Sequence, residues 1–210
     1  MFCAGILVFL VLVAIFAPVI APYDPTYQDY SAVLAEPSMA HPFGTDEYGR
    51  DILSRIIYGS RVSLSIGIVA QVVASLVGVT LGAVAGYYGG RIDSVISRIM
   101  EIFQAFPDLI FAMAIMTFLG KGVLNLFIAL GLLTWVRTAR MIRGSVMQLK
   151  EKEYIEASRA CGASTFWIIT KGLVPNCLST IIVLVTLGIP NAIMYEASLS
   201  FLGIGIQPPT

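Results

Sequence analysis

The sequence predicts an all-α polytopic membrane protein, and three observations support this class. Apolar residues make up 57% of the 210 residues and charged residues 12%, against roughly 45–50% and about 25% in soluble globular chains. The mean hydropathy is +0.85. Several stretches without a charged side chain reach the length of about 20 residues that a helix needs to cross a bilayer. A soluble fold of this length cannot bury this much apolar surface, so we divide the chain into membrane-spanning helices.

Composition also argues against several functions. Thirteen basic and thirteen acidic residues give no net charge, so the chain lacks the electrostatic footprint of a nucleic-acid-binding protein. The cysteines Cys3, Cys161 and Cys177 are odd in number and far apart, which favours buried free thiols over a disulfide or a metal site. The lone histidine, His41, adjoins Pro42 and is expected in a loop. We therefore expect no metal, no cofactor and no catalytic histidine.

Residues 1–21 contain no charged side chain and are the first expected span. No Lys or Arg precedes the apolar run, so it fits a span better than a signal peptide, and we expect a basic leader to be missing from the sequence. Residues 22–61 form a polar outer segment. In it, Thr45 is expected to cap a helix that lies in the membrane interface, with Asp51 and Arg55 paired one turn apart.

The second expected span, residues 62–90, begins a transmembrane core that covers 62–210. Its 29 residues carry no charge and would form a helix about 43 Å long, longer than a hydrocarbon core about 30 Å thick. Every fourth residue in it is small: Ala70, Ala74, Gly78, Gly82, Gly86 and Gly90. Such a ridge lets another helix backbone approach closely. We favour a packing face at Gly78, Gly82 and Gly86 over the ordinary glycine content of membrane helices.

Three more spans are expected, which makes five in all. Residues 91–106 are amphipathic, and Pro107 with Asp108 suits a kink or a helix start. A tight turn is expected at Gly120-Lys121-Gly122. The three spans are assigned to residues 102–119, 123–136 and 173–195.

The distribution of Lys and Arg sets the expected orientation. The loops 89–101 and 137–171 carry nine basic residues, whereas the segments on the other side carry four. The N-terminus is therefore expected on the cytoplasmic side. Five spans then place the C-terminus outside, and we expect a sixth span to be missing from this sequence.

The 137–171 loop is the most charged part of the chain, with 10 of its 26 charged residues. Residues 153–163 form a short expected helix, which Gly162 is placed to break, and Ser164 or Thr165 is placed to cap the next helix. A stripe of small residues follows one face: Ala157, Ala160, Cys161 and Ser164. Small residues beside charges favour a helix that docks closely into a groove of another protein.

Spaced motifs in this loop resemble the EAA loop of ABC importer permeases. Glu156-Ala157-Ser158 is followed by Gly162 six residues after the Glu and by Pro175 nineteen after it, as in that family. Ser158 departs from the second alanine but is still small, and Gly172, where an isoleucine is usual, is expected to loosen the second helix. Further motifs are similar to the C-type subunit of the dipeptide/oligopeptide/nickel group: His41-Pro42-Phe43-Gly44-Thr45-Asp46, Gly49-Arg50-Asp51, Glu196-Ala197-Ser198-Leu199-Ser200-Phe201-Leu202-Gly203 and Gln207-Pro208-Pro209.

The resemblance implies a MetI-like bundle of the type I ABC importers, in a bacterial or archaeal plasma (inner) membrane. It implies three kinds of partner besides lipid: a second homologous permease, two ABC ATPase subunits and an extracytoplasmic solute-binding protein. The implied coupling residues are Glu156 and Arg159 for polar contacts, Ala157 and Ser158 for close fit, Gly162 for the bend and Pro175 at the start of the last span. Peptides, nickel complexes and other small solutes all fit the group.

The sequence contains no G-x-x-x-x-G-K-[ST] motif, because Gly120-Lys121-Gly122 has no glycine five residues upstream. We therefore expect a transport subunit without its own ATPase site, not an enzyme. The rival classes are a membrane scaffold and an ion-gradient-driven secondary carrier, for which Asp108 and Glu196 are the candidate ionisable residues. Polar residues in or near the spans either line a pathway or make interhelical hydrogen bonds: Gln71, Asn125, Thr134, Ser179, Thr186 and Asn191.

Overall fold

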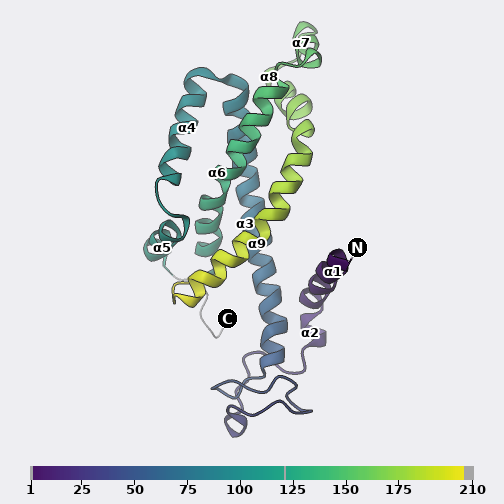
Figure 1. Cartoon of the computed structure of the whole chain (residues 1–210), viewed down its shortest axis with the longest axis vertical. Coiled ribbons are helices and arrows are strands. Elements are labelled where there is room, and N and C mark those ends of the chain that lie inside the picture. Colours follow the sequence, from purple (N-terminus) through teal and green to yellow (C-terminus); the bar gives the residue numbers. More distant parts are fainter. Residues whose placement is uncertain (1, 121, 206–210) are drawn as a thin grey trace. The chain divides into compact units, whose positions relative to one another are not determined.

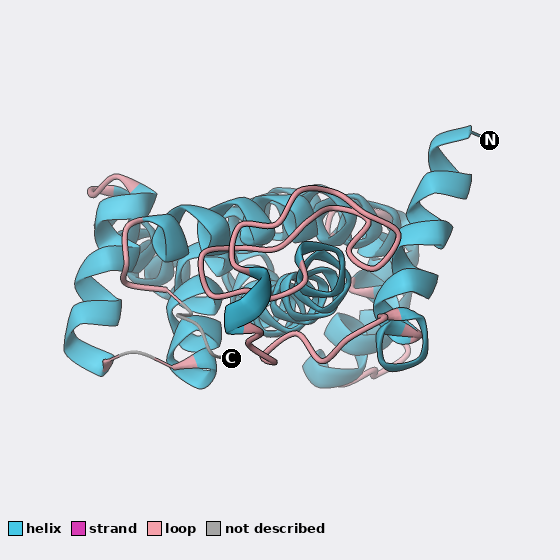
Figure 2. Cartoon of the chain, turned by 90° about the horizontal axis from the view of Figure 1, so that it is seen from below, coloured by secondary structure: helices cyan, strands magenta, loops and turns pink. Residues whose placement is uncertain are grey.

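The computed structural model describes residues 2–120 and 122–205, and within these ranges the regular structure is helical apart from one isolated β-bridge. Figure 2 shows these helices in cyan and the connecting loops in pink. The chain forms two compact units, one ending at Ile66 and one beginning at Gly67.

The N-terminal span of the first unit is broken into two helices. α1 covers Phe2–Ile15 and α2 covers Ala17–Ile20. Pro18 causes the break, because proline has no N–H to donate and its ring clashes with the carbonyl four residues earlier. The 14 residues of α1 extend about 21 Å. The single helix expected over residues 1–21 is therefore shorter and interrupted.

Two aspartates hold the polar segment that follows, which contains a short 3₁₀ helix, η1 (Tyr30–Ala32). Asp46 accepts hydrogen bonds from the backbone N–H of Tyr48 (2.9 Å) and from N (3.0 Å) and Nε (2.8 Å) of Arg50. Asp51 accepts from Ser54 N (2.8 Å) and Ser54 Oγ (2.7 Å), and its other oxygen lies 3.0 Å from His41 Nδ1. These side chains fix the chain just before the next helix.

That helix, α3, covers Ile52–Tyr88 without a break, which differs from the expected interfacial helix starting after Thr45. The Thr45 side chain does not cap a helix: its hydroxyl donates to Ala32 O and accepts from Ala35 N (2.8 Å). Asp51 supplies the cap instead. The predicted ion pair of Asp51 with Arg55 is wrong, because Arg55 pairs with Asp46.

The second unit is a bundle of helices, in which α4, α6 and α9 run beside the remainder of α3 (Figure 1). The elements are α4 (Gly90–Gln104), α5 (Asp108–Leu119), α6 (Val123–Leu149) and α9 (Leu178–Phe201). α6 continues 13 residues beyond the expected end of the fourth span at residue 136. Arginine is a good helix former, so the charges at Arg137, Arg140 and Arg143 do not end the helix.

The ridge of small residues on α3 lies against α6. A Cβ on Gly78 would stand 2.6 Å from Thr138 Cβ, one on Gly86 would stand 2.7 Å from Arg143 O, and one on Gly82 would overlap Ala139 O. Ala70 and Ala74 are fully buried, whereas Gly90 has nothing within 4 Å. Three consecutive helical turns of α3 therefore touch the α6 backbone directly.

A sharp break separates α4 from α5. The two helices make an angle of 88°, and Pro107 adjoins Asp108 at the start of α5. The kink expected at this position is confirmed, but a single straight span over residues 102–119 is not formed. The turn expected after α5 includes Lys121, which lies outside the described residues.

An ion pair attaches α4 to α6. Asp93, in the first turn of α4, accepts two hydrogen bonds from the Arg143 guanidinium, one of them 2.6 Å from Nη2 to Oδ2. Such a bidentate pair fixes both distance and orientation. It holds the first turn of α4 beside the part of α6 that contacts the glycine ridge of α3.

Fewer complete spans are present than the five expected. By length and hydropathy, three helical stretches among the described residues can cross a membrane: Ile52–Tyr88, Val123–Leu149 and Thr165–Phe201. The bent pair α4–α5 makes a fourth if it is counted as one span, and α1 belongs to the shorter apolar helices.

The glycine contact predicts a strong cost for a single methyl group. Gly82→Ala should lower the stability of the chain by about 1–3 kcal/mol, because the new Cβ must push α3 away from α6. Thermal unfolding in detergent measures this change. Gly59→Ala in the same helix is the matched control, since no atom lies within 4 Å of its added Cβ, and it should stabilise by about 0.5–1 kcal/mol. Equal effects of the two changes would contradict the close contact.

The hydrogen bonds that Asp46 accepts predict that the folded polar segment, residues 22–51, loses stability in acid. Burial acts to raise the pKa of Asp46, but the N–H groups of Arg50 and Tyr48 and the Arg50 guanidinium outweigh it and leave the pKa below its ordinary value. A carboxylate with a depressed folded-state pKa contributes stability above its unfolded pKa of about 4 and loses it as the pH falls through the folded-state pKa. Limited proteolysis of the 22–51 region should accelerate below about pH 4, and Asp46→Asn should give the fast cleavage already at pH 7.

Candidate functional site

A short helix, α7 (Glu153–Ala160), follows α6 and lies at one end of the bundle (Figure 1). Glu153 and Glu156 occupy its first turn and Arg159 its last, where each charge is favourable toward the helix dipole. The expected short helix is confirmed, although it ends at Ala160 instead of residue 163. The chain then turns through Cys161 and Gly162.

Gly162 ends α7 with a left-handed backbone conformation, φ +81°. The N–H of Gly162 bonds to Arg159 O (2.9 Å) and that of Ala163 to Ser158 O (3.0 Å), which satisfies two carbonyls at the helix end. No atom lies within 4 Å of a Cβ built there, so backbone conformation, not space, requires the glycine. Ser164 caps the next helix by accepting from Trp167 N (3.3 Å), as expected.

One side chain anchors α7 to the bundle. Ile155 is fully buried in an apolar cluster formed with residues of α3, α6 and the segment after α7. The buried members of this cluster are Ala83, Ile142, Val146, Ile155, Ile168, Leu173 and Cys177. Any displacement of α7 must therefore move Ile155 against the ends of α3 and α6 or carry them with it.

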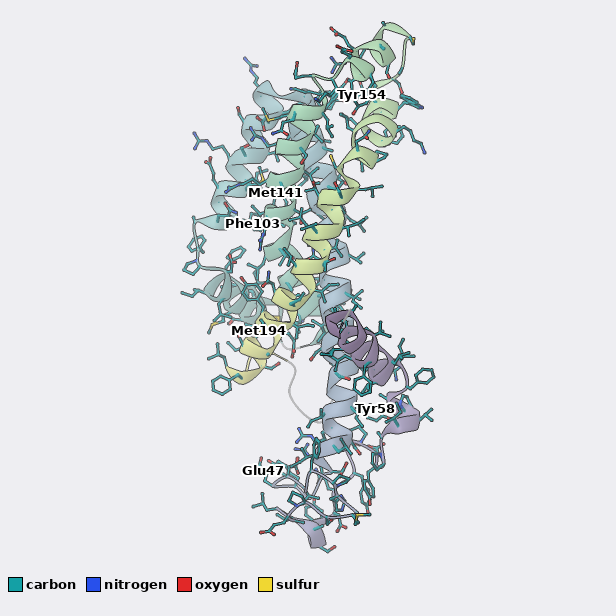
Figure 3. All side chains as sticks on the ribbon, turned by 45° about the vertical axis from the view of Figure 1, so that its right-hand side comes forward. Glu47, Tyr58, Phe103, Met141, Tyr154 and Met194 are labelled. Atoms are coloured by element: carbon teal, nitrogen blue, oxygen red, sulfur yellow. The ribbon has the colours of Figure 1, made fainter. Side chains whose placement is uncertain are left out.

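Gly172 adds to this anchor through its backbone. A Cβ on Gly172 would stand 3.0 Å from Ile155 Cδ1, so Ile155 occupies the space that a larger residue would need. The Gly172 carbonyl accepts hydrogen bonds from the Tyr154 hydroxyl (3.3 Å) and from Asn176 Nδ2 (2.6 Å). Figure 3 labels Tyr154 at this end of the bundle. The position that departs from the EAA pattern is thus a contact point between α7 and the following helix.

The segment after α7 is an irregular helix. α8 (Thr165–Trp167) leads into a π-helical stretch, η2 (Ile168–Leu173), and a 3₁₀ turn, η3 (Pro175–Cys177). Pro175 has no N–H to offer Lys171, and its ring excludes the normal i−4 hydrogen bond; one residue earlier, Val174 N bonds to Ile169 O (2.9 Å). The second helix is loosened over this π-helical stretch, which contains Gly172, and Pro175 rather than Gly172 accounts for the missing hydrogen bond.

A second contact holds α7 to α3. The Arg159 guanidinium carbon lies 5.4 Å from the centre of the Tyr87 ring, a cation–π distance. Ser158 instead donates its hydroxyl to Tyr154 O (2.7 Å) within the helix, so it presents no free donor outward. Of the two residues expected to make polar contacts, Arg159 therefore already has a partner inside the chain.

The outward side of α7 is small and acidic, and aromatic side chains follow it. Glu153, Glu156, Ala157 and Ala160 are exposed. Phe166 is 78% exposed and Trp167 is 49% exposed. Exposed aromatic side chains beside small residues are typical of a surface that another protein covers.

A second feature is a cavity of about 200 Å³ between the helices of the bundle. Five elements contribute its walls: α3, the end of α4, the start of α5, the middle of α6 and α9. The lining residues are Gln71, Phe103, Gln104, Asp108, Leu133, Thr134, Val136, Arg137, Thr138, Leu184, Leu187, Gly188, Asn191 and Tyr195. Figure 3 shows Phe103 near the middle of the bundle.

The structure separates the polar residues that the sequence left undecided. Gln71, Thr134 and Asn191 line the cavity. Asn125 and Thr186 are not among the lining residues and donate to backbone carbonyls, Asn125 to Leu119 O (2.7 Å) and Thr186 to Ile182 O (2.8 Å). The Thr134 hydroxyl also donates to a backbone carbonyl, Leu130 O (2.8 Å). Sequence reasoning missed Gln104 and Tyr195 as lining residues, because they lie on different helices, α4 and α9, whose packing the sequence does not reveal.

Family profiles match most of the chain. Residues 78–210 match the binding-protein-dependent transport system inner membrane component family. Residues 1–37 match the N-terminal TM domain of oligopeptide transport permease C. The C-terminal motif Gln207-Pro208-Pro209, quoted above for its resemblance, lies outside the described residues.

Curated relatives are similar over nearly the whole chain. The dipeptide transport system permease protein DppC of Bacillus subtilis is 45% identical over 97% of this chain and 64% of its own length. The oligopeptide transport system permease protein OppC of the same organism is 42% identical over 97% and 67%. The glutathione transport system permease protein GsiD of Pectobacterium atrosepticum is 40% identical over 98% and 69%. The chain thus spans about two thirds of the length of these relatives.

A solved structure shares the fold. The MetNI methionine ABC transporter in inward-facing conformations matches with a TM-score of 0.57 at 23% identity, covering 68% of this chain and 71% of that chain. At this identity the likeness concerns the fold alone, and it supports the expected MetI-like bundle.

The anchor predicts selective loosening of α7. Ile155→Ala should remove about 2–5 kcal/mol of packing free energy and speed amide hydrogen exchange in residues 153–160 more than in α6. Ile182→Ala is the matched control, because Ile182 is 62% exposed and should leave exchange in α7 unchanged. Unaltered exchange in Ile155→Ala would show that this side chain does not hold the helix.

Proposed function

The chain belongs to the binding-protein-dependent transport system inner membrane component family, and from this premise we propose that it is a permease subunit of an ABC importer. Its substrates are peptides or related small solutes, with nickel complexes as the alternative that the sequence resemblance leaves open. The similar proteins are dipeptide, oligopeptide and glutathione transport permeases, which supports the peptide class.

One observation carries the coupling role: α7 presents a small, exposed surface, while one buried side chain, one hydrogen bond and one cation–π contact tie it to α3, α6 and the segment that follows α7. Closure of the ATPase subunits would displace α7. Ile155 would pass that displacement to α6 and, through Gly172, to α8–α9. Arg159 would pass it to α3 through Tyr87.

The proposed role of each coupling residue follows from its exposure. Glu156 lies on the outer side of α7 and is available for an ionic contact with the ATPase. Ala157 gives the ATPase room for close approach, and Ser158 keeps the surface small because its hydroxyl is turned to Tyr154 O. Gly162 sets the bend, and Pro175 sets the irregular start of the last helix.

The proposed assembly contains a second homologous permease, two ABC ATPase subunits and an extracytoplasmic solute-binding protein. The chain sits in a bacterial or archaeal plasma membrane with its N-terminus on the cytoplasmic side, so that α7 faces the ATPases. The permease has no ATPase site of its own, and ATP is hydrolysed on the partner subunits. This division leaves Asp108 and Glu196 without the role that an ion-gradient-driven carrier would require of them.

Gly162→Asp should uncouple ATP hydrolysis from uptake in the assembled, full-length importer. The new side chain would strain a residue at φ +81°, and its carboxylate would meet the ATPase surface. The measurement is solute taken up per ATP hydrolysed in proteoliposomes. Gly120→Asp is the matched control, since Gly120 has φ +82° and open space, and it should keep coupling within about twofold of wild type. Unchanged coupling in Gly162→Asp would remove the proposed role of α7.

The energy source separates the importer from a secondary carrier. Uptake should continue when ionophores collapse the ion gradients while ATP is kept constant, and it should stop when ATP is depleted with the gradients intact. The opposite pattern would favour the carrier and assign Asp108 to ion binding.

A further inference from the structure

The cavity between α3, α4, α5, α6 and α9 has a composition unlike the rest of the bundle. It brings one acidic and one basic side chain, Asp108 and Arg137, to the same space, together with neutral amides and hydroxyls. Ionisable residues within apolar helices are costly and commonly mark a substrate path. The volume of about 200 Å³ is below the roughly 300–1,000 Å³ of sites that enclose a drug-sized ligand. The cavity therefore suits one end of a small solute.

The two charged groups differ in how they are held. Asp108 begins α5 and accepts a hydrogen bond from the Tyr195 hydroxyl of α9 (2.7 Å), which orients its carboxylate and leaves further lone pairs for a ligand. Among the described residues, none accepts a hydrogen bond from Arg137 or forms an ion pair with it. By contrast Arg143, less than two turns further along α6, donates two hydrogen bonds to the Asp93 carboxylate. The N–H groups of the Arg137 guanidinium are thus available to a group from outside the chain.

Neutral polar groups complete the wall. Gln71 is 2% exposed, donates from Nε2 to Ser75 Oγ (3.2 Å), and fits only because Gly188 has no side chain at the point that its amide oxygen occupies. Thr134 and Asn191 stand on α6 and α9. Amide and hydroxyl groups can match the donors and acceptors of a peptide bond.

We propose that this cavity is a binding subsite for a zwitterionic peptide, in which Arg137 receives the terminal carboxylate and Asp108 the terminal ammonium group. A guanidinium forms two parallel hydrogen bonds to a carboxylate, and a carboxylate oriented by a tyrosine hydroxyl accepts readily from an ammonium group. Both charged side chains remain largely exposed, so the contacts are weakened by solvent and the peptide is released onward. The subsite rests on the proposed importer function and specifies the solute that it passes.

The test uses the complete full-length importer in proteoliposomes, with its binding protein loaded with one of three probes: dialanine, dialanine amide or N-acetyl-dialanine. Each variant is compared with wild type for the same probe, so that the preference of the binding protein cancels. Arg137→Gln should lower uptake of dialanine about tenfold or more and change uptake of the amide by less than about twofold. Asp108→Asn should lower uptake of dialanine similarly and leave the N-acetyl peptide nearly unchanged.

Controls keep the outcome specific. Arg140→Gln removes an exposed arginine from the same helix that does not line the cavity, and it should transport all three probes as wild type does. Arg137→Lys, which restores the charge without the fork, should recover part of the dialanine uptake. If Arg137→Gln does not assemble, the proposal is tested with Arg137→Lys and the same three probes. Relative to wild type, this variant should lose more uptake of dialanine than uptake of dialanine amide.

Two results would overturn the subsite. Equal losses for all three probes would show that Arg137 and Asp108 support the bundle or contact the second permease, and unchanged uptake would show that they do not meet the peptide. The proposed importer function fails separately, if wild-type proteoliposomes take up none of the probes in the presence of ATP.

Discussion

The direct backbone contact between α3 and α6 is the constraint on which the rest of the second unit depends. Gly78, Gly82 and Gly86 leave no side chain between the two helices, and α6 backbone and side-chain atoms fill the space that a Cβ would take. In lipid, helices gain little from apolar burial against each other, so close van der Waals contact must supply the association. The three-turn contact makes α3 and α6 a rigid pair, and the ion pair of Asp93 with Arg143 adds α4 to it.

Both candidate sites use this rigid pair as a frame. The cytoplasmic end, as proposed, holds α7 through Ile142 and Val146 of α6 and through Tyr87 of α3. The middle of the same α6 carries Thr134 and Arg137 into the cavity. The opposite wall of the cavity belongs to α9, which continues from the irregular segment that contacts α7. As proposed, a displacement of α7 would therefore act on two walls of the cavity by different routes, one of which passes through the π-helical stretch before Pro175.

Sequence reasoning succeeded where a residue type carries its own backbone requirement. Proline at 107 and glycine at 162 mark the bends that the structure contains, because neither conformation depends on distant contacts. It failed where charge served as a boundary marker. α6 runs past Arg137, since arginine favours helix and Arg143 has a partner on α4. Sequence reasoning also failed at Thr45, which was expected to cap a helix. Its hydroxyl donates to Ala32 O and accepts from Ala35 N instead. The motif that resembles the EAA loop is defined by spacings along the chain, so it could be recognised in the sequence. The cavity forms where five elements pack together, so it could not.

The contrast between Arg137 and Arg143 is the strongest reason to give the cavity a role of its own. The two arginines lie six positions apart on one helix and share its backbone environment, yet one is engaged by a carboxylate across the helix interface and the other faces a cavity. Replacing Arg143 with an apolar residue would leave Asp93 without its partner. No described residue pairs with Arg137 in the way that Asp93 pairs with Arg143, so contacts within the chain do not explain a cation at position 137. A cation on α6 that forms no hydrogen bond or ion pair with the described residues supports the proposed ligand of this cavity, and Asp108 in the same lining supports a ligand that carries both signs.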